Sequence, residues 1–263
     1  MAAHKPSVAV IGLGLVGGSV ARALTAAGYR VTGVDWPFVV RRALATRAVA
    51  VGRMRAEAAA ACDVVVLAAP PATNLRLLRR LAKLARPGLV LTDVSSVKGE
   101  IAHEAARLRL RGFVGGHPMA GSEKRGFAAS SATLFRGRPW WIVPGRNARA
   151  TRVVRALVRA TGARPITIDA ATHDRAMAFL SHGPQVVSWA ILDAARLDPV
   201  ARRHLRRAGS GFKDMTRLAR SPRPLWREIL AANRDEVARA LAALVRQLRS
   251  SQAAGGTGRG GSR

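Results

Sequence analysis

The sequence predicts an α/β fold, with an N-terminal Rossmann-type, doubly wound parallel sheet followed by an all-helical C-terminal domain. Three observations lead to this prediction. Up to residue 169, short apolar runs typical of buried parallel strands alternate with segments whose apolar residues recur at helical spacing. A glycine-rich turn joins the first strand to the first helix. Beyond residue 169 the apolar residues recur only at helical spacing.

The N-terminal elements can be placed in order along the chain. SVAVIG (residues 7–12) is a short apolar run that ends in glycine, VGGSVARALTAA (16–27) has helical spacing, and YRVTGVD (29–35) is a second strand. Gly28 suits the left-handed residue that ends a helix. Further strands are expected at residues 63–69, 88–94, 112–116, 139–145 and 163–169, with helices at 74–85, 98–110 and 151–162.

The C-terminal domain is expected to begin with one long helix at residues 171–197, kinked at Pro184. Helical segments with short breaks continue to residue 250. The last residues, SQAAGGTGRGGSR, are rich in glycine and are expected to be disordered. The predicted division is therefore a dinucleotide-binding domain at 1–169, a helical domain at 170–250 and a disordered tail at 251–263.

Composition excludes several classes of protein. An apolar fraction of 49% over 263 residues is enough to bury a full core. Cys62 is the only cysteine, which excludes disulfides and thiolate zinc sites within one chain, and no other metal-ligand spacing occurs. The N-terminus lacks the apolar core of a signal peptide, and no uncharged apolar stretch is long enough to span a membrane. A cytoplasmic protein with no membrane partner and no metal is expected.

The formal net charge of +29 suggests a nucleic-acid or membrane partner at first sight. However, the arginines are spread over helical segments, and no aromatic residues interleave with them as in a nucleic-acid-binding groove. We therefore expect a solvated basic surface and no specific nucleic-acid partner. A non-enzymatic basic protein that binds nucleotides or nucleic acid remains the alternative from a different functional class.

A dinucleotide site is predicted at the glycine-rich turn. Gly12, Gly14 and Gly17 match the G-x-G-x-x-G pattern between a predicted strand and helix, where glycines allow a tight turn, approach of a pyrophosphate and close packing. Asp35 ends the second predicted strand, where a carboxylate binds the adenosine ribose hydroxyls. Its charge favours NAD over NADP, although the nearby Arg41 and Arg42 weaken that preference.

Four further stretches stand out. They are DVSSVKG (93–99), GGHPMAGSEKRGF (115–127), THDRAMAFLSHGPQ (172–185) and SGFKDMTRLARSPRPLW (210–226). Together with the glycine pattern they resemble the prephenate/arogenate dehydrogenase family of tyrosine biosynthesis over residues 7–248. HPMAGSE and GFKDMTR are the most specific parts. The resemblance implies an oxidoreductase that removes a hydride from the ring carbon bearing the 4-hydroxyl group, while the ring carboxylate leaves as CO2.

Three polar residues are expected beside the nicotinamide. Ser95 and Ser96 follow one predicted strand and His117 follows the next, so they share the carboxyl edge of the sheet, where ligands bind. Ser95 is expected to contact the cofactor. The resemblance implies that His117 is the base that takes the hydroxyl proton and that Ser96 orients it; a neutral imidazole suits this role near pH 7. The glycines before His117 are expected to let its loop approach the cofactor closely.

Substrate-binding residues are expected in the helical domain. The resemblance assigns a carboxylate of the substrate to Arg217, whose planar guanidinium binds carboxylates in bidentate fashion. Trp226 is a candidate wall of the pocket, with a core or interface tryptophan as the alternative. His182 and Gln185 share a helix face; His182 either lines the pocket or is a buried helix histidine. Family members often carry a second histidine at the position of Gln185, which leaves recognition of the substrate side chain open.

The resemblance, together with the predicted dinucleotide site, implies an NAD-dependent enzyme that converts prephenate to 4-hydroxyphenylpyruvate. The resemblance further implies a homodimer formed through the helical domain, with the active site between the domains. Arogenate is the alternative substrate, because it differs from prephenate only in carrying an ammonium group in place of the keto group. Another two-domain NAD(P)-dependent dehydrogenase, such as a β-hydroxyacid dehydrogenase, is a further alternative, but it leaves HPMAGSE unexplained.

Overall fold

The computed structural model describes residues 5–121 and 124–256 of the chain. The chain divides into two compact units, Met1–His173 and Asp174–Arg263, which are called here the α/β unit and the helical unit. The division falls four residues after the boundary expected from the sequence.

The α/β unit is built on one eight-stranded sheet with the order β3-β2-β1-β4-β5-β6-β7-β8. Its strands are β1 (Val8–Ile11), β2 (Val31–Val34), β3 (Val51–Arg53), β4 (Val64–Leu67), β5 (Val90–Asp93), β6 (Phe113–Pro118), β7 (Pro139–Val143) and β8 (Arg164–Thr167). All neighbouring strands are parallel except β6 and β7. The predicted α/β class and Rossmann-type sheet are therefore confirmed, with one antiparallel pair that the sequence did not reveal.

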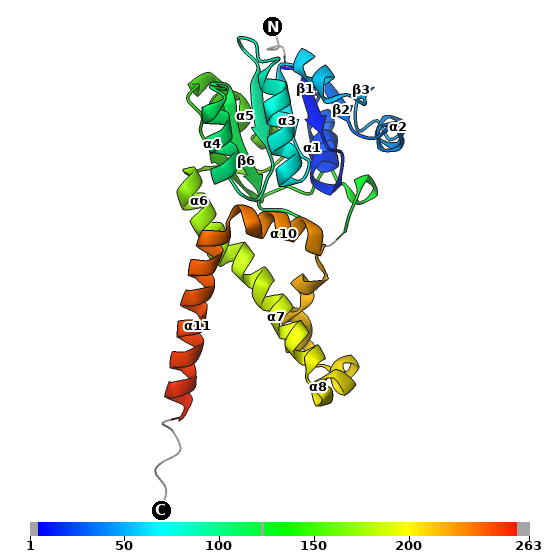
Figure 1. Cartoon of the computed structure of the whole chain (residues 1–263). Helices are drawn as coiled ribbons and strands as arrows, with labels where there is room; N and C mark the ends of the chain where they lie inside the picture. Colours follow the sequence, from blue (N-terminus) through cyan, green and yellow to red (C-terminus); the bar gives the residue numbers. More distant parts are fainter. Residues whose placement is uncertain (1–4, 122–123, 257–263) are drawn as a thin grey trace, which may run out of the picture. The chain divides into compact units, whose positions relative to one another are not determined.

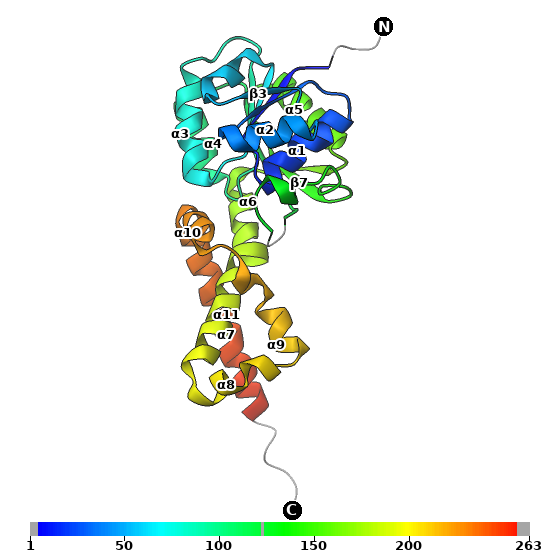
Figure 2. The same ribbon diagram turned by 90° about the vertical axis from the view of Figure 1, so that its right-hand side faces the viewer.

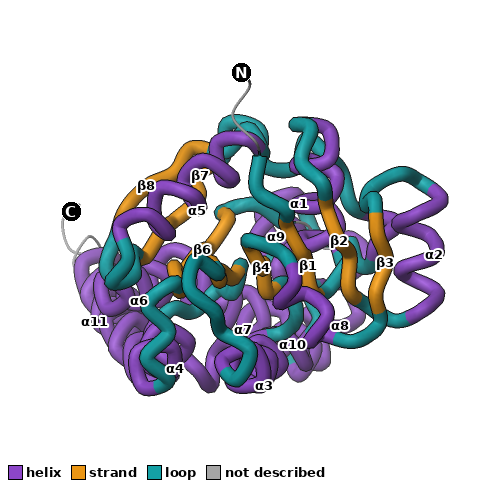
Figure 3. Tube along the Cα trace, turned by 90° about the horizontal axis from the view of Figure 1, so that it is seen from above, coloured by secondary structure: helices purple, strands orange, loops and turns teal. Residues whose placement is uncertain are grey.

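Helices cover the sheet on both faces. They are α1 (Leu15–Ala26), α2 (Pro37–Ala45), α3 (Pro71–Ala82), α4 (Gly99–Arg107) and α5 (Ala148–Ala160), with a 3-10 turn η1 at Ala56–Ala61. Figure 3 shows α1 and α5 on the side of the sheet opposite α3 and α4. Strand side chains alternate between these layers: Val8 and Val10 join the core under α1 and α5, whereas Ala9 and Ile11 join the core under α3, α4 and η1. The central strands are buried on both faces, which explains their continuous apolar sequences.

The antiparallel pair follows from the connection between β6 and β7. A parallel return needs a crossover, usually a helix, across one face of the sheet. Residues 119–138 contain only a short 3-10 turn, η2 (Phe127–Ala129), among their described residues. Phe127 and Phe135 in this connection are buried in the core under α1 and α5. The chain therefore returns beside β6 in the opposite direction.

The helical unit begins within one long, irregular helical segment. Its elements are α6 (Ala170–Met177, which starts in the α/β unit), the π-helical turn η3 (Ala178–His182), α7 (Gly183–Leu197), α8 (Pro199–His204), η4 (Leu205–Arg207), α9 (Ser210–Met215), η5 (Arg217–Arg220), α10 (Arg223–Ala232) and α11 (Arg234–Gly256). Figures 1 and 2 show these helices, with α7 and α11 diverging from the region of η3 in Figure 1. A small core of Ala178, Val237 and Ala240 joins η3 to α11.

Two details of the helical unit differ from expectation. The irregularity expected at Pro184 lies in the preceding turn, Ala178–His182, and Pro184 stands in the first turn of α7, where its missing N–H costs no helical hydrogen bond. Helix α11 continues to Gly256, six residues into the segment expected to be a disordered tail. Serine, glutamine and two alanines at 251–254 allow a helix to extend. Residues 257–263 of the expected tail lie outside the described residues.

Candidate active site

The glycine-rich turn leaves space for a ligand at one glycine and for none at the other two. Gly12 has φ +93°, and a Cβ atom on it would lie 2.7 Å from the carbonyl oxygen of Ala68. A Cβ atom on Gly17 would lie 1.8 Å from the carbonyl oxygen of Gly12. Gly14, which precedes the first turn of α1, faces open space, with nothing within 4 Å of such an atom. The N-terminus of α1 is therefore accessible at the position where a pyrophosphate binds in this type of turn.

Asp35 stands directly after β2 and organises this turn. Its Oδ2 accepts a hydrogen bond from the backbone N–H of Leu13 at 2.6 Å, and its Oδ1 accepts one from the N–H of Trp36 at 2.6 Å. The carboxylate is thus held beside the glycine turn at the carboxyl edge of the sheet. This position fits the ribose-binding role expected of it.

The DVSSVKG stretch contains a buried ion pair that the sequence analysis did not identify. Lys98 and Asp93 are completely buried and bonded to each other. The ammonium group of Lys98 also donates to the carbonyl oxygen of Gly116 at 2.7 Å, and Asp93 Oδ1 accepts from the N–H of Gly116 at 3.0 Å. The pair therefore binds both polar groups of Gly116, the residue just before His117.

The two residues that precede His117 in the sequence are glycines, and the surrounding atoms leave little room for a side chain at either position. A Cβ atom on Gly116 would lie 2.5 Å from the carbonyl oxygen of Asp93, and one on Gly115 would lie 3.3 Å from the side chain of Lys98. Both glycines, like His117 itself, belong to strand β6 and are buried. Both glycines therefore stand in the strand and admit the Asp93–Lys98 pair, and the approach of this segment to a cofactor stays a prediction.

The two serines after β5 have different surroundings. Ser95 is buried; its N–H donates to Asp93 Oδ2 at 2.9 Å, and its hydroxyl accepts from Nδ2 of Asn74 at 2.9 Å. Asn74 is completely buried and also binds the end of β4, through the N–H of Ala69 at 3.1 Å. Ser96 is half-buried, and its hydroxyl makes no hydrogen bond within the described part of the chain. Asn74 was not singled out from the sequence, because a lone asparagine in an amphipathic helix gives no signal of such a bridge.

His117 contacts a second histidine. Nδ1 of His117 lies 2.9 Å from Nε2 of His173, and the two rings meet edge to face with their centroids 5.1 Å apart. His117 is 7% exposed and His173 is fully buried. Just before His173, Asp169 caps α6 by accepting a hydrogen bond from the N–H of Thr172 at 2.9 Å. Hydrogen bonds from Thr172, first from its side chain and then from its backbone N–H, lower the pKa of Asp169.

Three of the predicted substrate-binding residues gather around α7 in the helical unit. His182 is completely buried, and its ring lies edge to face with that of Trp226 at a centroid distance of 6.0 Å. The amide nitrogen of Asn233 lies 3.0 Å from Nδ1 of His182 and donates to the carbonyl oxygen of Asp174 at 2.8 Å. An amide nitrogen only donates, so Nδ1 of His182 is the acceptor. Gln185 is also completely buried.

Gln185 is bonded to the short turn η5, which begins with Arg217. Nε2 of Gln185 donates to the carbonyl oxygen of Leu218 at 2.8 Å, which ties α7 to the residue after Arg217. The other amide atom, Oε1, is buried without a hydrogen-bond partner among the described residues. The guanidinium group of Arg217 is exposed and forms no ion pair within the same residues. A buried acceptor and an unpaired cation are therefore available here to polar groups of a ligand.

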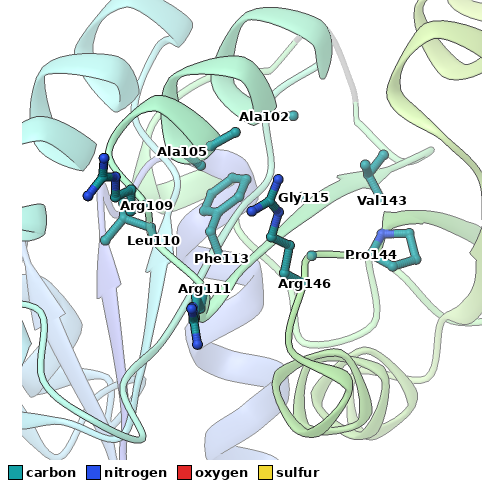
Figure 4. A pocket seen from close by; sticks show the side chains of 12 residues that line it. Ala102, Ala105, Arg109, Leu110, Arg111, Phe113, Gly115, Val143, Pro144 and Arg146 are labelled. Carbon is teal, nitrogen blue, oxygen red and sulfur yellow. The ribbon is translucent and has the colours of Figure 1, made fainter.

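No group of three or more His, Cys, Asp or Glu residues is arranged to hold a metal ion in the described ranges. Nor does any helix there combine the length and apolar character needed to cross a bilayer. A cavity of about 570 Å³ lies at the opposite end of β6 from His117, and Figure 4 shows the ring of Phe113 there between the side chains of Arg109 and Arg146. None of the predicted site residues lines it.

Comparison with known proteins identifies both units. The family model described as the prephenate dehydrogenase nucleotide-binding domain matches residues 20–167, and the model of the prephenate dehydrogenase dimerization domain matches residues 169–254. The chain is 32% identical over 249 residues to the prephenate dehydrogenase of Bacillus subtilis and 31% identical over 237 residues to that of Lactococcus lactis. These matches cover 89% and 86% of this chain but 66% and 64% of the relatives, so the chain spans about two thirds of their length.

Solved structures agree with this assignment. The Aquifex aeolicus prephenate dehydrogenase in complex with hydroxyphenyl propionate and NAD+ has a TM-score of 0.88 at 26% identity, covering 95% of this chain and 90% of that one. The Synechocystis arogenate dehydrogenase has a TM-score of 0.81 at 27% identity, covering 93% and 90%. With both domain models matched over most of its length, the chain belongs to the prephenate dehydrogenase family.

Proposed function

We propose that the chain is an NAD-dependent prephenate dehydrogenase of tyrosine biosynthesis, which converts prephenate to 4-hydroxyphenylpyruvate and CO2. The observation that carries this proposal is the placement of His117. It lies at the carboxyl end of β6, in the same parallel set of strands as the open glycine turn after β1. The proposed base and the proposed nucleotide site would therefore share one edge of the sheet. The family membership and the NAD+ complex of the Aquifex relative support the same reaction.

The proposed cofactor is NAD, which when bound supplies the hydride acceptor. The N–H groups at the start of α1 would bind its pyrophosphate beside Gly14, and Asp35 would bind the adenosine ribose. The fixed carboxylate of Asp35 would repel the 2′-phosphate of NADP, which favours NAD. Ser95 lies at the adjoining strand end and would contact the nicotinamide half.

In the proposed mechanism His117 takes the proton of the 4-hydroxyl group as the hydride leaves the same carbon. The bond to the ring carboxylate then breaks and CO2 departs. Its electron pair enters the ring and forms a phenolate, to which the imidazolium of His117 returns the proton. Ser96 would hydrogen-bond to the substrate hydroxyl or to His117 and keep the two aligned. The buried setting of His117 limits access of water to the proton transfer.

The helical unit would supply the groups that recognise the substrate. Arg217 would bind a carboxylate of prephenate through its unpaired guanidinium group. His182 and Trp226 would form a wall of the pocket, supported by the contact between their rings. Gln185 would hydrogen-bond the keto side chain by its amide. Glu123, the acid best placed in the sequence to receive the ammonium of arogenate, lies outside the described residues.

The helical unit would also form a homodimer. Helices α7 and α11 diverge, and a predominantly apolar groove of about 650 Å³ lies between residues of α7, α9, η5 and α11. Phe179 at its rim is 45% exposed, and further large apolar side chains are exposed on the same unit: Leu180, Leu197, Val200, Met215, Val245 and Leu248. An apolar surface of this extent is typical of an interface between subunits. A second copy of the chain is the occupant that the matched dimerization domain supports.

The activity is tested by following absorbance at 340 nm with each combination of prephenate or arogenate and NAD or NADP. The proposal predicts the highest kcat/KM with prephenate and NAD. A higher value with arogenate would assign the other substrate, and no reduction of either nucleotide with either substrate would refute the dehydrogenase assignment.

The role of His117 is tested by the variant His117→Asn. Its kcat is expected to fall by about 10²–10⁴-fold, the usual contribution of a positioned general base. Binding of NAD, measured by calorimetry, should stay at the wild-type value because the glycine turn is untouched. His204→Asn, which changes an exposed histidine of α8, is the control and should leave kcat unchanged. A His117→Asn enzyme with nearly full kcat would exclude His117 as the base.

A further inference from the structure

We propose that His173 is a positioning residue for His117, which fixes the tautomer and orientation of that imidazole and accepts a hydrogen bond from the imidazolium formed in the reaction. This inference rests on the proposed dehydrogenase function. Its basis is a contact between two buried side chains inside the α/β unit.

The geometry of the contact is that of a hydrogen bond. Nδ1 of His117 and Nε2 of His173 are 2.9 Å apart, the usual separation of a nitrogen donor and acceptor. Two neutral imidazoles can make this bond only if one of the nitrogens carries a proton and the other does not. The tautomers of the two rings are therefore coupled. The edge-to-face arrangement, with an angle of 71° between the ring planes, lets a ring nitrogen of one histidine point at the other.

The contact determines which nitrogen of His117 serves the reaction. With Nδ1 directed at His173, the proton of the substrate would be received at Nε2, on the far side of the ring. Once His117 is an imidazolium, both of its nitrogens are donors, and the new cation needs an acceptor at Nδ1. Nε2 of His173 lies within hydrogen-bonding distance of that nitrogen. In serine proteases a buried aspartate serves the same purpose for its histidine; here the acceptor is neutral.

The fold holds His173 firmly enough for this role. Its ring is completely buried, which restricts its rotamers. Its backbone N–H donates to the carbonyl oxygen of Asp169 at 3.0 Å, in the first turn of α6. The side chain of Asp169 caps the same turn through Thr172. The corner between β8 and α6 thus sets the position of the histidine, and a buried polar pair of this kind is costly to break on one side only.

The test compares two substitutions of His173 that differ in polarity. In His173→Gln, the side-chain amide can place an oxygen or a nitrogen near the position of Nε2, so kcat is expected to stay within a few-fold of wild type. In His173→Leu, which has no polar atom, kcat is expected to fall by about 10–100-fold, as when a residue that orients a catalytic ligand is lost. KM for prephenate and the Kd for NAD should change little in both. The matched control is His103→Leu, at an exposed position on α4.

Three outcomes would overturn the inference. The first is a wild-type kcat in His173→Leu. The second is an equal loss of kcat in both variants, which would show that only the volume of the ring matters. The third is a change confined to KM. A second measurement does not depend on activity. In protein labelled with ¹⁵N-histidine, Nδ1 of His117 should show the shift of a hydrogen-bonded nitrogen in wild type and lose it in His173→Leu.

The spectroscopic measurement also separates this inference from the proposed function. If the wild type lacks dehydrogenase activity but shows the bonded Nδ1, the function fails and the histidine pair stands as a structural feature. If His173→Leu does not fold, the spectrum of the wild type and the kinetics of His173→Gln still decide the matter. A wild-type Nδ1 without a hydrogen bond would refute the pair.

Discussion

At the scale of single residues, the position of His117 depends on charges buried behind it. Asp93 and Lys98 bind the N–H and the carbonyl oxygen of Gly116 and so fix the peptide that leads into His117. Both charges are fully removed from water, and each is satisfied by the other and by backbone groups. Such a pair contributes little net stability compared with apolar packing, but removing one partner leaves an uncompensated charge.

The buried Asp93–Lys98 pair predicts an asymmetry between single and double substitutions. Lys98→Met should lower the free energy of unfolding by about 3–5 kcal/mol, because Asp93 would remain buried and unpaired. The double variant Asp93→Asn/Lys98→Met should recover a large part of that loss, since no charge is left, and an asparagine oxygen can still accept from Gly116. Urea denaturation of the single and double variants measures both values. Equal destabilisation in the two proteins would contradict the prediction.

The sequence predicted the site residues that stand in continuous motifs. It did not predict the residues from distant parts of the chain that contact them. Gly12, Gly14, Gly17 and Asp35 carry a signal because their spacing reflects one local turn. The contact of His173 with His117 joins residues 56 positions apart, and no local spacing reveals it. Asn74 and the Lys98–Gly116 bond likewise depend on which strands are neighbours in the sheet. The roles proposed for Ser96, Arg217 and Trp226 remain predictions that the kinetics must decide.

At the scale of elements, one carboxylate ties two helices together. Glu104 on α4 accepts a hydrogen bond from Arg79 on α3 at 2.7 Å and two from Arg107 on its own helix. The bonds from Arg107 and then Arg79 lower the pKa of Glu104 from 4.5 to about 2. Helices α3 and α4 cover the same face of the sheet, and this contact links the two helices to each other.

The lowered pKa predicts how the α/β unit responds to acid. Because the folded pKa lies below the unfolded value, the stabilising contribution of Glu104 is fully present above about pH 4.5. It is lost as the pH falls through the range from about 4.5 to about 2. Glu104→Gln removes this dependence, so its melting temperature should fall less steeply than that of wild type across that range. Thermal denaturation at several pH values tests this; parallel curves for the two proteins would exclude the contribution.

The elements themselves followed from the sequence where the periodicity was strong. The strands around the glycine turn lie where expected, and the amphipathic helices α3 and α5 each begin three residues before the expected position. The short strand β3 and the turn η1 were missed, because three residues at a sheet edge and an alanine-rich turn carry no distinct pattern. The direction of β7 depends on the packing of the preceding connection, and the π-helical turn before Gly183 depends on tertiary contacts with α11. Neither has a periodicity of its own.

At the scale of the whole molecule, the helical unit is expected to hold two chains together. Phe179→Asp places a charge at the rim of the apolar groove and should shift the protein from dimer towards monomer in sedimentation velocity. Phe38→Asp is the matched control, because Phe38 is 59% exposed on α2 in the α/β unit, against 45% for Phe179. Only the first variant should dissociate. A dimer of unchanged strength in Phe179→Asp would place the interface elsewhere.

The net charge of +29 gives the last prediction, which concerns the substrate. A strongly positive protein attracts anions over distances comparable to the Debye length, which shortens from about 30 Å at 0.01 M salt to about 10 Å at 0.1 M. Prephenate carries two carboxylates, whereas the ammonium group of arogenate offsets one of its two. Added salt should therefore lower kcat/KM for prephenate more steeply than for arogenate.

The kcat of the saturated enzyme should change little over the same range, because screening acts mainly on encounter and binding. The measurement is kcat/KM for both substrates at saturating NAD between 0.01 and about 0.3 M sodium chloride, the range over which the Debye length falls below the size of a binding site. Equal slopes for the two substrates would show that local contacts such as Arg217, and not the field of the whole molecule, determine the electrostatic part of substrate selection.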